Sequence, residues 1–207
     1  MLTTITKVRA YIIKRCSLHN HLFNKKQGGI ILKNRGISKN SKRIKKIARI
    51  SLFAGLYIVL TFLTYPVSYG NLGIEFRISE VLVLLCFFNS EYIIALTIGC
   101  FFSNLFGTVG IIDALFGTFA TFISCYCIYK SKNIFVGSLF PVIFNGIIVG
   151  TMLYFIYSIP IIFAMLGVAI GEFLVVSVIG CPLMLLLKKN KEVVSLLELT
   201  EEDEIIK

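Results

Sequence analysis

IFVGSLFPVIFNGIIVGTMLYFIY runs from Ile134 to Tyr157, and PIIFAMLGVAIGEFLVVSVIGCPLMLLL follows from Pro160 to Leu187. Across both stretches the only acidic or basic side chain is Glu172. About 20 consecutive apolar residues suffice for a helix to cross the ~30 Å hydrocarbon core of a bilayer. Each stretch therefore predicts a transmembrane helix.

The rest of the chain extends this pattern. Hydrophobic residues make up 57% of the 207 residues and the mean hydropathy is +0.85, more than a soluble fold of this size can hide from water. We therefore predict an all-α integral membrane protein, a six-helix transmembrane bundle. The expected helices are 47–66, 80–88, 92–106, 111–129, 134–157 and 160–187. The second is too short to span unaided, so it could be tilted, longer or partly re-entrant.

Basic residues predict the orientation. Fourteen of the 21 Lys and Arg residues precede Ile50, and basic segments beside a span favour the cytoplasmic face and anionic lipid over nucleic acid. Six crossings would then place Lys130, Lys132 and Lys188 inside and leave only Arg77 outside. We expect a multi-pass protein of the cell membrane with both termini cytoplasmic. Its parts would be a basic, disordered or poorly ordered extension (1–45), a membrane domain (46–190) and a tail (191–207).

Catalytic and metal-binding signatures are missing from the sequence. It has no nucleotide P-loop and no H-E-x-x-H, and its two histidines both lie in the basic extension. Five of the six cysteines lie in apolar runs, where Cys behaves as a small hydrophobe. We therefore predict neither an enzyme nor a bound cofactor or metal.

A few polar residues lie where hydrocarbon is expected. Buried charges and amides are costly in a bilayer, so they usually face a cavity or a partner. In the predicted topology they line a path from the outer surface to about the midplane, which suits a site that is loaded from outside. The candidate substrate-binding residues are Arg77, Glu80, Asn104, Asp113, Asn145 and Glu172.

Structural roles compete with binding for several of them. Asp113 could cap the helix that begins at Ile111, and Arg77 could pair with Glu80, three residues away. Asn145 follows Pro141, whose ring could kink the helix, and the Asn145 amide could bond the local backbone. Glu172 is the hardest to explain structurally and the strongest functional candidate.

Small residues four apart mark close helix contacts. For Gly146/Gly150 and Gly167/Gly171, packing inside the bundle is the simpler interpretation. Ser51 and Gly55, near the cytoplasmic end of the first span, instead predict a face on which a partner could dock.

The polar set also indicates a ligand class. Carboxylates accept hydrogen bonds from amidine-like N–H edges or pair with ammonium groups, and Asn both donates and accepts. A flat, nitrogen-rich, neutral or cationic ring fits better than a phosphate. Candidate stacking aromatics are Tyr65, Tyr69, Phe76, Phe101, Phe102 and Phe106.

Several motifs together resemble the queuosine-precursor transporter family QueT, in order and without large gaps from about Ile47 to Lys189. They are EFRISE (75–80), FFNSEYIIALTIG (87–99), NLFG (104–107), GIID (110–113), FGT (116–118), PVIFNG (141–146) and GE (171–172).

The resemblance implies an S component of an energy-coupling-factor transporter. Such a subunit would bind a deazapurine precursor of queuosine from outside and associate with a transmembrane coupling subunit and two ATPases. S components typically dock through an Ala-x-x-x-Ala face on the first helix, and Ser51 and Gly55 stand at the comparable positions. Asn104, Asp113, Asn145 and Glu172 would form the pocket, with Arg77 and Glu80 ordering the loop that closes it. The alternatives are a self-sufficient proton-coupled transporter, in which Asp113 or Glu172 carries protons, and a purely structural subunit.

Overall fold

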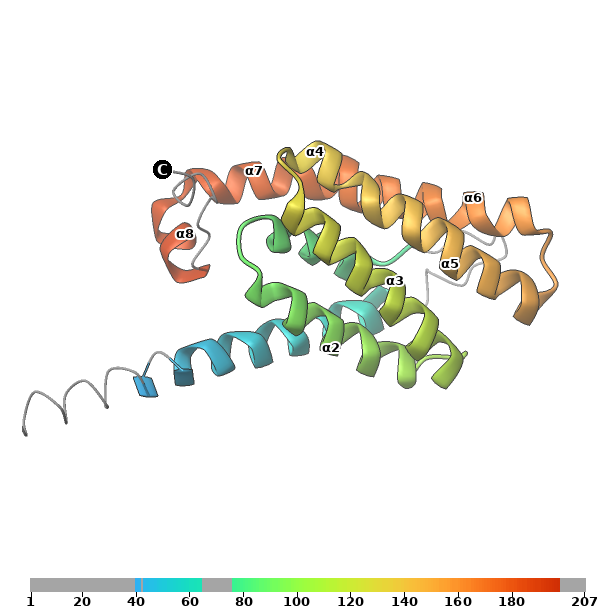
Figure 1. Cartoon of the computed structure of the whole chain (residues 1–207), viewed down its shortest axis with the longest axis horizontal. Coiled ribbons are helices and arrows are strands. Elements are labelled where there is room, and N and C mark those ends of the chain that lie inside the picture. The colour runs from blue at the N-terminus through green and yellow to red at the C-terminus, as the bar shows by residue number, and fades with distance from the viewer. Residues whose placement is uncertain (1–39, 42, 65–75, 198–207) are drawn as a thin grey trace, which may run out of the picture. The chain divides into compact units, whose positions relative to one another are not determined.

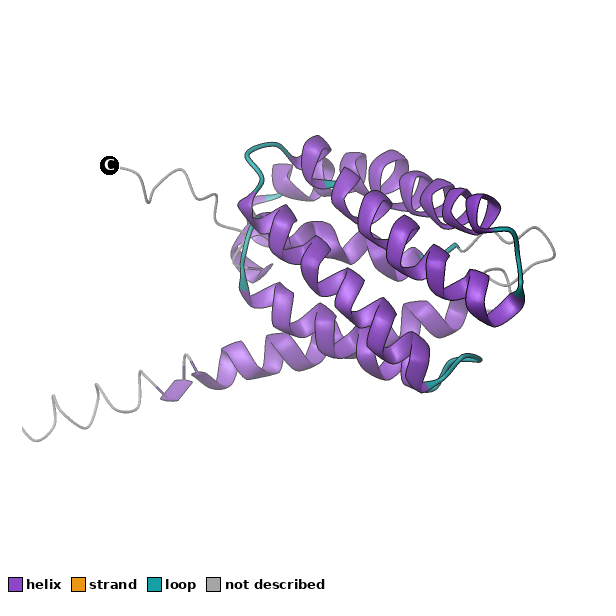
Figure 2. Ribbon diagram, turned by 45° about the vertical axis from the view of Figure 1, so that its right-hand side comes forward, coloured by secondary structure: helices purple, strands orange, loops and turns teal. Residues whose placement is uncertain are grey.

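The structure is a computed structural model that describes residues 40–41, 43–64 and 76–197. The chain divides into two compact units, residues 1–47 and 48–207. The description that follows concerns the second unit, and it includes residues 43–47 only as the start of the helix that continues into this unit. Its described residues form helices joined by short connections, without a strand (Figure 2). The predicted basic extension falls almost wholly outside the described residues, as does the connection 65–75.

The described helices follow one another along the chain, and Figure 1 labels α2 to α8. They are a first helix (Arg43–Thr64), the 3-10 helix η1 (Ile78–Phe87), α2 (Glu91–Leu105), α3 (Ile111–Lys130), α4 (Ile134–Gly137), α5 (Leu139–Tyr157), α6 (Ile161–Glu172), the wide-turned π-helix η2 (Phe173–Gly180), α7 (Cys181–Lys189) and α8 (Lys191–Leu197).

Among the described residues, four helical stretches are long and apolar enough to cross a membrane: Arg43–Thr64, Ile111–Lys130, Ile134–Tyr157 and Ile161–Lys189. Large apolar side chains such as Phe155 and Phe163 lie on the outer surface, more than 70% exposed, as a lipid-facing surface requires. The all-α membrane fold is confirmed. The count of six spans is not, because η1 and α2 are shorter apolar helices.

Helix η1 differs from the short α-helix predicted at 80–88. It is a 3-10 helix of ten residues, which at about 2 Å per residue extends ~20 Å, nearly the length of the 15-residue α2. Val83, Leu84 and Cys86 in η1 are fully buried. Because the other helices cover it, η1 does not have to match the thickness of the lipid.

Helices α5 and α6 pack side by side (Figure 1). A Cβ added to Gly150 would fall 2.6 Å from the Met165 Cα, and one added to Gly146 would fall 3.2 Å from the Ala169 Cβ. The prediction that Gly146 and Gly150 serve internal packing is therefore confirmed. The predicted helix 134–157 is interrupted at Ser138. Pro141, three residues later, has no backbone N–H, so it cannot donate a helical hydrogen bond to the preceding turn.

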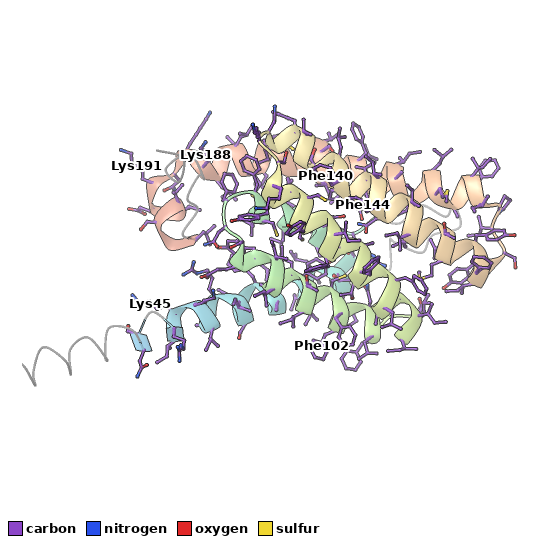
Figure 3. All side chains as sticks on the ribbon, in the orientation of Figure 1. Lys45, Phe102, Phe140, Phe144, Lys188 and Lys191 are labelled. Atoms are coloured by element: carbon purple, nitrogen blue, oxygen red, sulfur yellow. The ribbon has the colours of Figure 1, made fainter. Side chains whose placement is uncertain are left out.

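Basic residues gather at one end of the helices. Lys130 ends α3, Lys132 follows it, and Lys188 and Lys189 end α7; Figure 3 labels Lys188 beside Lys191 at this end. The connections after α2 and after α5 lie at the opposite end (Figure 1). The helices therefore have a basic end and an end poor in basic residues.

Residues 191–197, which the sequence analysis placed in the tail, form helix α8. Val194 and Leu197 pack against the hydrophobic core, and the Leu197 carbonyl accepts a hydrogen bond of 2.7 Å from the Tyr92 hydroxyl. Residues 198–207 lie outside the described range.

Candidate functional site

All six candidate residues are buried, none more than 9% exposed. Their side chains therefore point into the protein and away from lipid, as their polarity requires. Hydrogen bonds join Arg77 to Asn104 and Asp113, and Asn145 to Glu172.

We call Arg77, Asn104 and Asp113 the arginine cluster. Arg77 Nη2 lies 3.1 Å from Asp113 Oδ2 and forms an ion pair with it, while Arg77 Nη1 donates to Asn104 Oδ1 at 2.9 Å. Asn104 Nδ2 donates in turn to the Asp113 backbone carbonyl at 3.3 Å. One cation, one anion and one amide thus join the start of η1 to the end of α2 and the start of α3, at the end poor in basic residues.

Asp113 lies in the first turn of α3 but does not cap it. The N-cap is Gly110, without a side-chain cap hydrogen bond, and Asp113 turns inward to Arg77. Gly117, one turn later, makes room for the cluster: a Cβ there would fall 2.5 Å from Asn104 Nδ2 and 2.8 Å from Asp113 Oδ1. Nothing in the sequence pattern distinguishes Gly117 as a site residue.

Glu80 is hydrogen-bonded to the first helix. The Tyr57 hydroxyl donates to Glu80 Oε1, and one turn further along, Thr61 Oγ1 donates to Ser79 Oγ at 2.8 Å. Tyr57 and Thr61 were not among the predicted site residues, although their spacing of four places both on one helix face. This face ties the first helix to η1 just beyond Arg77.

Asn145 and Glu172 form a second polar pair, between α5 and the end of α6. Asn145 Nδ2 donates to Glu172 Oε1 at 2.7 Å, so the amide bonds Glu172 on the neighbouring helix. Gly146 lets α5 approach Ala169 beside the pair, and the wide turns of η2 begin directly after Glu172. Such π-helical turns are frequent at functional sites.

The candidate stacking aromatics differ in how exposed they are. Phe102 and Phe106 are 43% and 70% exposed, and Figure 3 shows Phe102 pointing outward from α2, so neither covers the polar pairs. Phe76 packs partly buried against the core. Tyr65 and Tyr69 lie outside the described residues.

The predicted docking face of the first helix is open. Ser51 and Gly55 are both exposed, and a Cβ added to Gly55 would meet nothing within 4 Å. The buried side of the same helix carries Ala54 and Tyr57. Ser51 and Gly55 are therefore not packed against the other described residues of this unit.

Long apolar helices with buried polar clusters between them define a multi-pass membrane protein. Within the described ranges, no three His, Cys, Asp or Glu residues gather as a metal site would require. The chain matches the profile of the QueT transporter family over residues 47–189, and it belongs to that family. Membership of a transporter family agrees with the prediction of a transport protein and not an enzyme.

One curated relative is the queuosine precursor transporter QueT of Lactococcus lactis subsp. cremoris (strain MG1363), 40% identical over 79 residues. The aligned segment covers 37% of this chain and 45% of that relative, less than half of its length. No solved structure shows a significant match.

Proposed function

We propose that this protein is the substrate-binding S component of an energy-coupling-factor importer and that it captures a queuosine precursor, a deazapurine, from outside the cell. Its family and the name of its relative support the transport of such a precursor. The observation that carries the proposal is the buried Asn145–Glu172 pair, because carboxylate and amide oxygens between two membrane helices suit the N–H groups of a nitrogen-rich ring.

The two polar groups have different roles in this proposal. Asn145 and Glu172 bind the ligand from α5 and α6. Asn104 and Asp113 complete the pocket, while Arg77 and Glu80 hold the start of η1, which directly follows the connection 65–75. Since the Asp113 carboxylate is paired with Arg77, Glu172 is the stronger candidate for a cationic or amidine-like group.

In the proposed topology η1 and α2 complete six crossings. The basic end, with Lys130, Lys132 and Lys188, then faces the cytoplasm, as the positive-inside rule favours. Residues 1–45 and 191–207 flank the membrane domain on that side. The arginine cluster lies toward the outer surface, where the substrate enters.

The proposed partners are a transmembrane coupling subunit and two ATPases. Ser51 and Gly55 would form the docking face for the coupling subunit, because they are exposed and small enough to let another helix approach closely.

A binding measurement tests the proposed site. Radiolabelled 7-aminomethyl-7-deazaguanine should bind the purified chain, and Glu172→Gln should weaken binding by about tenfold or more, because a neutral amide replaces a charged acceptor. The matched control is Glu192→Gln, which alters an exposed residue of α8. Unchanged affinity in Glu172→Gln would remove Glu172 from the pocket.

An uptake measurement tests the proposed class. Proteoliposomes that contain the chain, a coupling subunit and two ATPases should accumulate the labelled precursor only with ATP. Uptake by the chain alone, without ATP, would contradict the assignment as an S component and indicate a self-sufficient transporter.

A further inference from the structure

The Asn145 amide has a fixed orientation. Its side chain bonds Glu172 Oε1 at 2.7 Å, and only the NH₂ half of an amide can donate to a carboxylate. The NH₂ group therefore faces Glu172 and Oδ1 faces away from that bond. Close packing of α5 on α6 at Gly146 and Ala169 holds the two backbones at this spacing.

Asn145 Oδ1 is a buried acceptor without a hydrogen-bond partner among the described residues. Asn145 is only 4% exposed, so this oxygen cannot turn to bulk water. A buried acceptor left without a donor destabilises the fold, and in a binding protein a donor from the ligand would remove that penalty.

Asn104 provides an internal comparison. Its Oδ1 accepts from Arg77 and its Nδ2 donates to the Asp113 carbonyl, so both halves of this amide are used within the arginine cluster. Of these two buried amides, Asn145 is the one whose acceptor has no hydrogen-bond partner among the described residues.

We infer that Asn145 determines specificity: its Oδ1 accepts from one N–H of the ligand while the Glu172 carboxylate, which can accept several hydrogen bonds, accepts from a neighbouring N–H. The inference rests on the proposed function and deepens it. The site would select rings with two adjacent donors, such as the ring N–H and exocyclic NH₂ of a 2-aminopyrimidinone, and disfavour rings that lack one. An unpaired buried acceptor is what makes such a site discriminate.

Two ligands that differ by one donor test the inference on the unaltered protein. 7-Deazaguanine carries the 2-amino group and 7-deazahypoxanthine lacks it. By calorimetry on the full chain in nanodiscs, 7-deazaguanine should bind with a Kd at least about tenfold lower than that of 7-deazahypoxanthine. Equal affinities would overturn the inference and leave the proposed function intact, whereas failure of every deazapurine to bind would count against the proposed function itself.

Substitution then assigns the discrimination to Asn145. In Asn145→Leu the preference for 7-deazaguanine should shrink to about twofold or less, because the acceptor is gone. The control is Thr151→Val on the same helix, and it should keep the preference, because the Thr151 hydroxyl bonds the Ile147 carbonyl within the helix. If Asn145→Leu does not fold, the smaller Asn145→Ala gives the same measurement. A preference that persists in a folded variant would overturn the inference.

Discussion

Gly117 keeps the space that the arginine cluster occupies. Gly117→Ala would place a methyl group 2.5 Å from Asn104 Nδ2 and 2.8 Å from Asp113 Oδ1, so the cluster must shift. We expect a loss of about 1–3 kcal/mol in stability, the usual cost of overpacking, measured by thermal unfolding in detergent.

Gly55→Ala is the matched control for this prediction, since it adds the same methyl group to a helix where nothing lies within 4 Å. It should leave the stability unchanged or raise it by up to ~1 kcal/mol, because Ala favours helix. Equal destabilisation by both substitutions would show that Gly117 does not shape the cluster.

The Arg77–Asp113 ion pair should show strong coupling. Arg77→Met leaves a buried carboxylate without its guanidinium, and we expect a loss of about 3–5 kcal/mol. Arg77→Met with Asp113→Leu removes both charges and should be less destabilising than Arg77→Met alone. Chemical unfolding of the single and double variants measures this. Additive losses would mean that the two charges do not interact.

At the scale of elements, the packing of α5 on α6 depends on how closely two glycines approach the neighbouring helix. Gly150→Ala would bring a methyl group to 2.6 Å from backbone of Met165, whereas Gly146→Ala meets a side-chain methyl group at 3.2 Å. Backbone yields less readily than a side chain, so Gly150→Ala should be the more destabilising by about 1 kcal/mol or more. Thermal unfolding of the two variants decides the order, and the reverse order would contradict this account of the interface.

Two departures from α-helical geometry flank the polar residues. Arg77 and Glu80 lie at the start of the 3-10 helix η1, and Glu172 immediately precedes the wide-turned η2. Gly180, at the end of η2, lies against Leu84 of η1, where an added Cβ would fall 2.9 Å from the Leu84 Cδ1. The two irregular elements thus pack against each other beside the core.

At the scale of the whole membrane domain, the proposed orientation makes a prediction about access. Lys132→Cys and Lys191→Cys should react with an impermeant maleimide only from the cytoplasmic side, and Ser158→Cys only from outside, because Ser158 lies in the connection after α5 at the opposite end. Labelling of intact cells and of inverted vesicles measures this, with the unaltered chain as background. Labelling of Ser158→Cys from the cytoplasmic side would reverse the proposed topology.

The sequence by itself determined the class of protein and most helix positions. Hydropathy is a local, additive property, so α3 begins at Ile111 as predicted and the ends of α2 and α3 lie within one residue of expectation. The six charged or amide residues selected from the sequence are all buried, because a charge or amide facing lipid is too costly at any position along a span.

Only the tertiary structure decided which of these residues meet. Arg77 pairs with Asp113, 36 residues away. Tyr57 of the first helix bonds Glu80, and Asn145 of α5 bonds Glu172 of α6. The apolar pattern of residues 78–87 likewise predicts a helix but not its 3-10 form. These features depend on which helices lie side by side and how closely their backbones approach, and no periodicity along a single helix contains that information.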